Sequence, residues 1–116
     1  MAPAYDLAST LAFDDKNIDY SYAMAIGDAF HESELTAFEW ANFAASCRLR
    51  PQFVAAELKR MPPLLMERLP VVASQCIEKG ADSEVVGRVS EVVKRICAEQ
   101  TEVLPKIVAV DPEQFR

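Results

Sequence analysis

Two apolar stretches decide the fold class of this chain: PQFVAAELKRMPPLLMERLPVVASQCIEK at residues 51–79 and DSEVVGRVSEVVKRICAEQTEVLPKI at residues 82–107. In both stretches, apolar residues recur largely at spacings of three and four, which is the pattern of a helix with one buried face. The sequence therefore predicts a mostly all-α fold.

Prolines divide the first stretch into two expected helices. Pro51 suits the first position of a helix, because its missing N–H would have no partner there in any case, and this helix is expected to end near Met61. Pro62 and Pro63 remove two backbone donors and disfavour a helical conformation at the preceding residue. A break or sharp kink is therefore expected between residues 61 and 64.

The helix after this break is expected to run to about Lys79, with a bend at Pro70 and with Gly80 as its C-cap. Seven side chains define the apolar stripe of this helix: Leu64, Leu65, Met66, Leu69, Val72, Cys76 and Ile77.

Asp82 or Ser83 is expected to cap the last long helix, whose end should bend at Pro105. Its apolar side chains follow a seven-residue rhythm: Val85, Val89, Val92, Ile96, Val103 and Ile107. Such a stripe fits either the core of the domain itself or the seam of a coiled-coil dimer.

A further helix is expected upstream of these stretches. Thr36 is a suitable N-cap, and Glu39 three residues later would complete a capping box. The helix should end near Leu49. Its buried face is expected to carry Phe38, Trp40, Ala41, Phe43, Ala44 and Cys47.

The first 34 residues lack a helical period and are rich in turn formers, so this segment is expected to be irregular. Tyr20–Ile26 alternates weakly and precedes a glycine, which allows one short strand. We therefore expect a single helical domain over residues 1–116, with an irregular segment at 1–34 and helices at 35–116.

Composition limits the class of protein. Apolar residues make up 51% of 116 residues, enough for one sizeable core, and the formal net charge of −6 argues against a nucleic-acid partner. Charged residues interrupt the longest apolar stretch, and residues 1–10 lack the pattern of a secretory signal. The expectation is a cytoplasmic protein that binds neither nucleic acid nor membrane.

The three cysteines, Cys47, Cys76 and Cys97, are widely spaced and form no CxxC pair, so a zinc site is not indicated. All three lie among apolar neighbours on expected helices. Free cysteine often behaves as a small buried hydrophobe, and we expect these three in the core rather than in a redox or nucleophilic role.

No complete active site can be assembled from the sequence. A phosphate-binding loop needs clustered glycines, and the three glycines are isolated: Gly27, Gly80 and Gly87. The only histidine, His31, lies in a polar stretch and is expected to be solvated. Asp14 and Asp15 could in principle hold a divalent cation, but adjacent acidic residues in a loop more often face water.

Four segments nevertheless resemble one family in order and spacing. MAPAYDLAST at residues 1–10 resembles the APxYDLLST stretch near the C-terminal end of HipA-type serine/threonine kinases, the toxins of type II toxin–antitoxin systems. AMAIG at 23–27 is similar to the MAL(S/A)IGG segment that follows it in that family. LTAFEWANFAASCRLRP at 35–51 and MERLPVVAS at 66–74 resemble its subsequent helices.

The resemblance implies one site residue. In that family the aspartate of the YD pair binds the catalytic magnesium, and the corresponding residue here is Asp6. Mg²⁺ prefers oxygen ligands and bridges the phosphates of ATP during transfer. In the isolated chain, Asp6 could equally be a solvated residue near the terminus. Asp28 departs from the pattern, because the family commonly has a second glycine there.

The resemblance also implies what is missing. The kinase lobe that binds ATP, its phosphate-binding lysine and its catalytic loop have no counterpart in this sequence, so no catalytic residue is assigned and no activity is expected from this chain alone. A complete relative would use Mg²⁺ and ATP to phosphorylate a protein serine or threonine. The expected partners are the missing N-terminal kinase part and an antitoxin protein.

The alternative function is a stand-alone helical module that binds another protein through an exposed apolar face. Tyr5, Tyr20, Tyr22 and Phe30 are the candidates for that face, since they lie in the irregular N-terminal segment.

Overall fold

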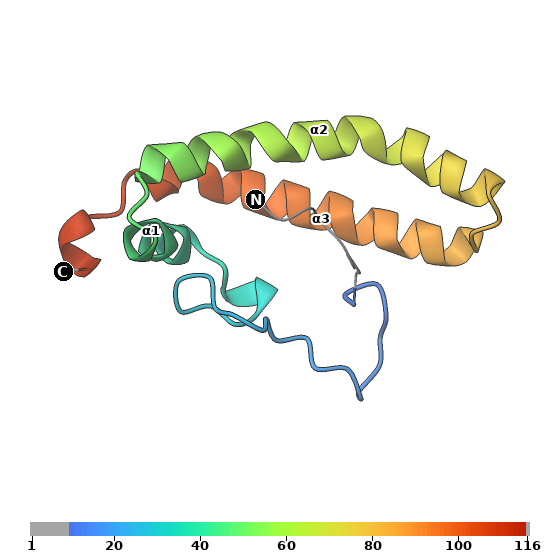
Figure 1. Cartoon of the computed structure of the whole chain (residues 1–116), viewed down its shortest axis with the longest axis horizontal. Helices are drawn as coiled ribbons and strands as arrows, with labels where there is room; N and C mark the ends of the chain where they lie inside the picture. Colours follow the sequence, from blue (N-terminus) through green and yellow to red (C-terminus); the bar gives the residue numbers. More distant parts are fainter. Residues whose placement is uncertain (1–9, 116) are drawn as a thin grey trace.

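The structure of this chain is a computed structural model that describes residues 10–115. Within these residues it consists of helices joined by short connections, and it contains no β-sheet (Figure 1). The mostly all-α prediction is confirmed. The elements are the 3₁₀ helix η1 (Glu32–Glu34), α1 (Ala37–Ser46), α2 (Pro51–Glu78), α3 (Ser83–Ile107) and the 3₁₀ helix η2 (Pro112–Phe115).

α2 and α3 lie side by side and antiparallel, and together they form a long hairpin (Figure 1). α1 packs across the base of this hairpin, and η2 returns to α1, where the rings of Phe38 and Phe115 lie 5.1 Å apart. The tip of the hairpin extends beyond both. The Cα radius of gyration is accordingly 16.1 Å, compared with about 13 Å for a compact domain of this length.

The turn between α2 and α3 has the hydrogen bonds of a Schellman motif. Gly80 has a φ of 99° and donates its N–H to the carbonyl of Ile77, and Ala81 donates to the carbonyl of Cys76, both at 3.0 Å. The Asp82 side chain then accepts the N–H groups of Glu84 and Val85, which caps α3. The predicted caps at Gly80 and Asp82 are confirmed.

The break predicted at Pro62 and Pro63 is wrong, because α2 is one continuous helix of 28 residues that also contains Pro70. The fixed φ of proline is compatible with a helix. A proline inside a helix removes one backbone hydrogen bond, and its ring collides with a carbonyl of the preceding turn, which can bend the helix without ending it. Pro62 is buried. Packing along α3 thus holds both halves of α2 in line, and Figure 1 shows α2 gently bowed.

Thr36 occupies the N-cap position of α1 as predicted, but the predicted capping box is absent. The Glu39 carboxylate instead accepts the N–H of Asp28 at 2.5 Å, and the Asn42 amide donates to the Asp28 carboxylate at 3.1 Å. The Glu39 carboxylate therefore holds the turn at residues 27–28 against α1. The two residues of this contact are eleven apart in sequence, whereas the residues of a capping box are three apart.

The strand expected over Tyr20–Ile26 does not form. Ile26 and Ala29 exchange two backbone hydrogen bonds of 3.0 and 3.1 Å, which make a single isolated bridge around Gly27 and Asp28. Gly27 has a φ of 62°, in the region that favours glycine. The segment is thus a tight turn docked on α1, too short to be part of a sheet.

Three contacts tie the N-terminal elements to α3. Arg95 forms two hydrogen bonds with the Glu32 carboxylate, at 2.7 and 3.3 Å. The indole N–H of Trp40 donates to the Gln100 side chain at 2.8 Å. The Arg88 guanidinium lies 5.8 Å from the centre of the Phe13 ring. Each contact joins residues far apart in sequence, so α3 helps to position the described segments that precede α2.

The core of the described residues is small. Its buried apolar side chains are Ala12, Ala29, Ala41, Ala44, Val54, Cys97 and Ile107. The predicted stripe of α3 from Val85 to Ile107 is half-buried or buried within the single chain, so it serves the domain's own core. The prediction of core cysteines holds for Cys97 alone. Cys47 and Cys76 are exposed, because Cys47 lies just past the end of α1 and Cys76 lies near the hairpin tip, where only α3 faces α2.

We expect Gly27→Ala to destabilise the fold by about 2 kcal/mol, because the new Cβ would need a positive φ and the surrounding backbone is close. That Cβ would lie 2.5 Å from the carbonyl oxygen of Glu39. Gly87→Ala in α3, where the added methyl meets nothing within 4 Å, is the control. It should raise stability by about 0.5–1 kcal/mol. Urea unfolding followed by circular dichroism measures both, and equal effects would contradict this role of Gly27.

The Glu32–Arg95 pair should make stability depend on pH. Hydrogen bonding from Arg95 lowers the pKa of Glu32, whose side chain is only 14% exposed. A carboxylate whose pKa falls on folding stabilises the fold above its unfolded pKa, and this stabilisation is lost as pH falls through the folded pKa. We expect Glu32→Gln to lower the free energy of unfolding by about 1 kcal/mol at neutral pH.

The effect of the same substitution should shrink as pH falls through the lowered pKa of Glu32, because the wild-type carboxylate then becomes protonated and loses its pair with Arg95. Glu57→Gln removes an exposed pair with Arg60 within α2 and serves as the control. A pH dependence of the same size in both variants would show that the Glu32 pair has no special role.

Candidate functional site

The residues predicted from the sequence as a site are divided by the structure. Asp6 and Tyr5 lie outside the described residues. The Tyr20 hydroxyl donates to the carbonyl oxygen of Phe13 and accepts the N–H of Asp15 at 3.1 Å. Tyr20 therefore serves the fold of its own loop.

Tyr22 is also engaged within the chain. It is half-buried, and burial, followed by the nearby Glu32 carboxylate, raises the pKa of its hydroxyl. Phe30, in contrast, has a 48% exposed side chain. Of the three predicted aromatics that the structure describes, Phe30 is thus the one that remains well exposed for a partner.

The acidic and histidine side chains do not converge on a metal site. The Asp15 carboxylate accepts the backbone and side-chain N–H groups of Asn17 at 2.8 and 3.0 Å, as expected of a turn residue. His31 and Asp14 are exposed. Over residues 10–115, no group of three or more histidine, cysteine or acidic side chains is arranged to hold a metal ion.

Several exposed apolar side chains of the described residues lie along one side of α2. Five side chains at spacings of three, four and seven make up this surface, which we term the α2 stripe: Met61, Leu64, Leu65, Val71 and Val72. Each is between 45% and 55% exposed. α3 covers the adjacent side of α2 through Pro62 and Leu69, and at the edge of the stripe Val72 lines a hollow with Val85 and Val89 of α3. Exposed apolar surface of this extent is typical of a binding face.

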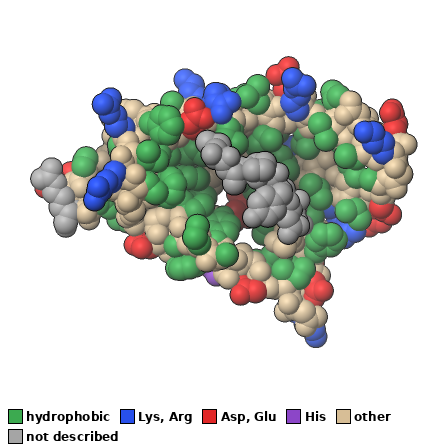
Figure 2. Space-filling model, in the orientation of Figure 1, with side chains coloured by type: hydrophobic (Ala, Val, Ile, Leu, Met, Phe, Trp, Pro, Cys, Tyr) green, Lys and Arg blue, Asp and Glu red, His purple; other side chains and the backbone are tan. Residues whose placement is uncertain are grey.

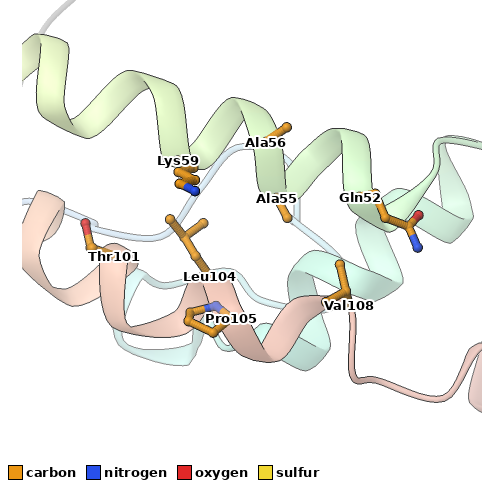
Figure 3. Close-up of a pocket in the computed structure, with 8 residues that line it drawn as sticks. All are labelled: Gln52, Ala55, Ala56, Lys59, Thr101, Leu104, Pro105 and Val108. Atoms are coloured by element: carbon orange, nitrogen blue, oxygen red, sulfur yellow. The ribbon is translucent and has the colours of Figure 1, made fainter.

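A second apolar feature lies on the opposite flank of α2, in the furrow between α2 and α3. Its first part has a volume of 490 Å³ and is lined by Ala55, Ala56 and Lys59 of α2, by Thr101 and Leu104 of α3 and by Val108 just after α3, among others (Figure 3). Figure 3 shows Lys59 and Ala55 facing Thr101 and Leu104 across the opening.

The second part of the furrow has a volume of 390 Å³ and shares Thr101 with the first part, so the two are adjacent. Pro63 and Met66 line it from α2, and Lys94 and Ala98 line it from α3. We term the whole feature the α2–α3 groove. Its small side chains leave room for another polypeptide to approach the two helices closely.

The sequence identified the apolar positions of α2 but not their exposure. Leu64, Leu65 and Val72 were expected to be the helix's buried face, and all three are at least 45% exposed. The sequence does contain a signal for this exposure. Apolar residues between 61 and 77 occupy several sides of the helix, and a single neighbouring helix cannot cover all of these sides. Figure 2 shows apolar side chains spread over much of the visible face, with many of the charged groups toward the outline.

Comparison with protein-family models, with curated proteins and with solved structures gives no match to this chain. Among the described residues, no helix combines the length and the apolar character needed to cross a membrane.

Polar substitutions in the α2 stripe should cost little stability in the isolated chain, because these side chains are already half in water. We expect Leu64→Gln with Val71→Gln to change the free energy of unfolding by less than about 0.5 kcal/mol. Ile107→Ala, which truncates a fully buried side chain, should cost about 2–4 kcal/mol. Urea unfolding compares the two, and a large loss from the stripe variant would show that the stripe belongs to the core.

Proposed function

We propose that this chain is a helical scaffold of a HipA-type protein kinase, inactive alone, which packs through the α2 stripe against the kinase part that carries the nucleotide lobe and catalytic loop. The observation that carries this proposal is the α2 stripe itself. A half-exposed row of five apolar side chains beside a small core is what a scaffold exposes when the part that covers it is absent.

The positions of the resembling segments support the same proposal. AMAIG forms the turn at Gly27, the residue that aligns with a family glycine, and the positive φ and close backbone there favour glycine. LTAFEWANFAASCRLRP forms α1 and its turn into α2, and MERLPVVAS lies within α2 and includes Val71 and Val72 of the stripe. Each of these three motifs therefore coincides with a turn or helix of the described residues.

In the assembled kinase, Asp6 would hold Mg²⁺ against the phosphates of ATP, and the substrate would be a protein serine or threonine. The remaining catalytic groups would come from the other part of the kinase. An antitoxin protein is the further partner of such an assembly. This chain would supply the rigid helical base on which the magnesium-binding segment is positioned.

The second candidate is a stand-alone interaction module in the cytoplasm. The same stripe favours it, together with the exposed Phe30. The two functions differ in their dependence on nucleotide, because a stand-alone module would bind its partner equally well with and without Mg·ATP.

The test mixes this chain with a separately produced nucleotide lobe and catalytic loop of a HipA-type kinase. Isothermal titration calorimetry with Mg²⁺ and a non-hydrolysable ATP analogue follows binding. We expect no binding by this chain alone, binding by the mixture, and at least a tenfold weaker affinity, equivalent to about 1.4 kcal/mol, with Asp6→Asn.

Asp14→Asn, which removes an exposed carboxylate from the same segment, is the matched control and should leave the affinity unchanged. Assembly that Leu64→Gln with Val71→Gln does not weaken would contradict the role of the stripe. Nucleotide binding that is indifferent to Asp6→Asn would contradict the role of the metal ligand.

A further inference from the structure

The charged side chains beside the α2–α3 groove follow a regular pattern. On α2, Lys59, Pro63 and Glu67 stand four residues apart and so form one row along the helix. On α3, Lys94, Ala98 and Glu102 form a row with the same spacing. Each row thus has a basic end, a small apolar centre and an acidic end. The two ends of a row are about 12 Å apart along the helix axis.

The two rows run in opposite directions along the groove. Lys59 and Thr101 line the first part of the groove, and Glu102, the residue after Thr101, lines the second part together with Lys94. Met66, the neighbour of Glu67, lines the same part as Lys94. Pro63 and Ala98 face each other in the middle. The groove is therefore bordered by one basic and one acidic residue at each end, around an apolar centre.

Most of these charges have no partner within the described chain. Lys59, Glu67 and Glu102 form no ion pair among residues 10–115, and Lys94 forms only an exposed pair with Glu91, three residues away. An exposed pair of this kind within one helix contributes little and exchanges readily. All four charges are thus free to pair with another molecule.

We infer that a second copy of this chain packs on the α2–α3 groove, so that two hairpins form a four-helix bundle about a two-fold axis that crosses the groove over Pro63 and Ala98. The axis lies in the interface, perpendicular to the helices, and sets α2 against α2 and α3 against α3. A two-fold axis requires a surface that is complementary to itself. Lys59 of one copy then meets Glu67 of the other, and Lys94 meets Glu102.

This arrangement gives four ion pairs between the copies around an apolar centre. The small side chains Ala55, Ala56 and Ala98 allow the helices to approach closely. Met66, with a 42% exposed side chain, falls near the other copy's Lys59 and can enter the groove beside it. The interface lies on the flank of α2 opposite the α2 stripe, so this inference does not rest on the proposed kinase function.

Sedimentation velocity over a range of concentrations tests the pairing through a charge reversal and its rescue. The wild-type chain should dimerise. Lys59→Glu places two carboxylates opposite each other at two sites and should raise the dimer dissociation constant at least tenfold, equivalent to about 1.4 kcal/mol. Lys59→Glu with Glu67→Lys exchanges the two charges, restores both pairs in this antiparallel arrangement and should restore the dimer.

Lys16→Glu makes the same change in net charge in an exposed loop and is the matched control. Circular dichroism verifies that each variant keeps its helix content. A wild-type chain that stays monomeric, a loss of the dimer in Lys16→Glu equal to that in Lys59→Glu, or a double variant that stays monomeric would each overturn this arrangement. A dimer that is lost in Leu64→Gln with Val71→Gln but kept in Lys59→Glu would place the second copy on the stripe instead and overturn it as well.

Discussion

The antiparallel contact between α2 and α3 is the constraint on which the rest of the structure depends. Four residues, Lys79 to Asp82, reverse the chain with a left-handed glycine and a side-chain cap, so the two long helices meet directly. The elements before α2 then attach to α3 through Arg88, Arg95 and Gln100, which lie along its length. Without the hairpin, neither α1 nor the turn at Gly27 would have a surface to pack on.

A hairpin of two helices buries little by itself, and this has a thermodynamic consequence. The buried apolar side chains of the described residues are mostly alanines, with Ile107 as the one large side chain that is fully buried. Apolar burial is the dominant favourable contribution to folding, and here it is small. The way in which the elements pack on one another therefore depends to a large extent on polar contacts, such as the Trp40–Gln100 hydrogen bond. A partner that covers α2 would add the burial that the chain lacks and would stabilise the folded state by mass action.

Local sequence was sufficient for features that depend on a few adjacent residues. The caps at Thr36, Gly80 and Asp82 follow from side-chain and backbone geometry within one turn of helix. The errors arose where a distant contact decides. Pro62 remains within a helix because α3 packs along it. The Glu39 carboxylate, expected in a capping box with Thr36, instead accepts the N–H of Asp28. The exposure of the stripe was missed for the same reason. Periodicity identifies the apolar positions of a helix, but it does not show which neighbouring elements cover them. For the predicted site, the sequence named aromatics in the N-terminal segment, whereas the larger apolar surface lies on α2.

The two uncovered flanks of α2 differ in a way that indicates two kinds of contact. Between Leu64 and Val72 the stripe consists of large apolar side chains, and such a surface gains from permanent burial, as in obligate interfaces. The groove is built of small side chains and bordered by charges of both signs, which set register and partner choice more than affinity. Because α2 is a single bowed helix, both flanks are held at fixed angles to each other by α3. A permanent partner on the stripe and a second copy on the groove would therefore bind at the same time without competing for any side chain. Both interfaces would then contain α2, each on a different flank.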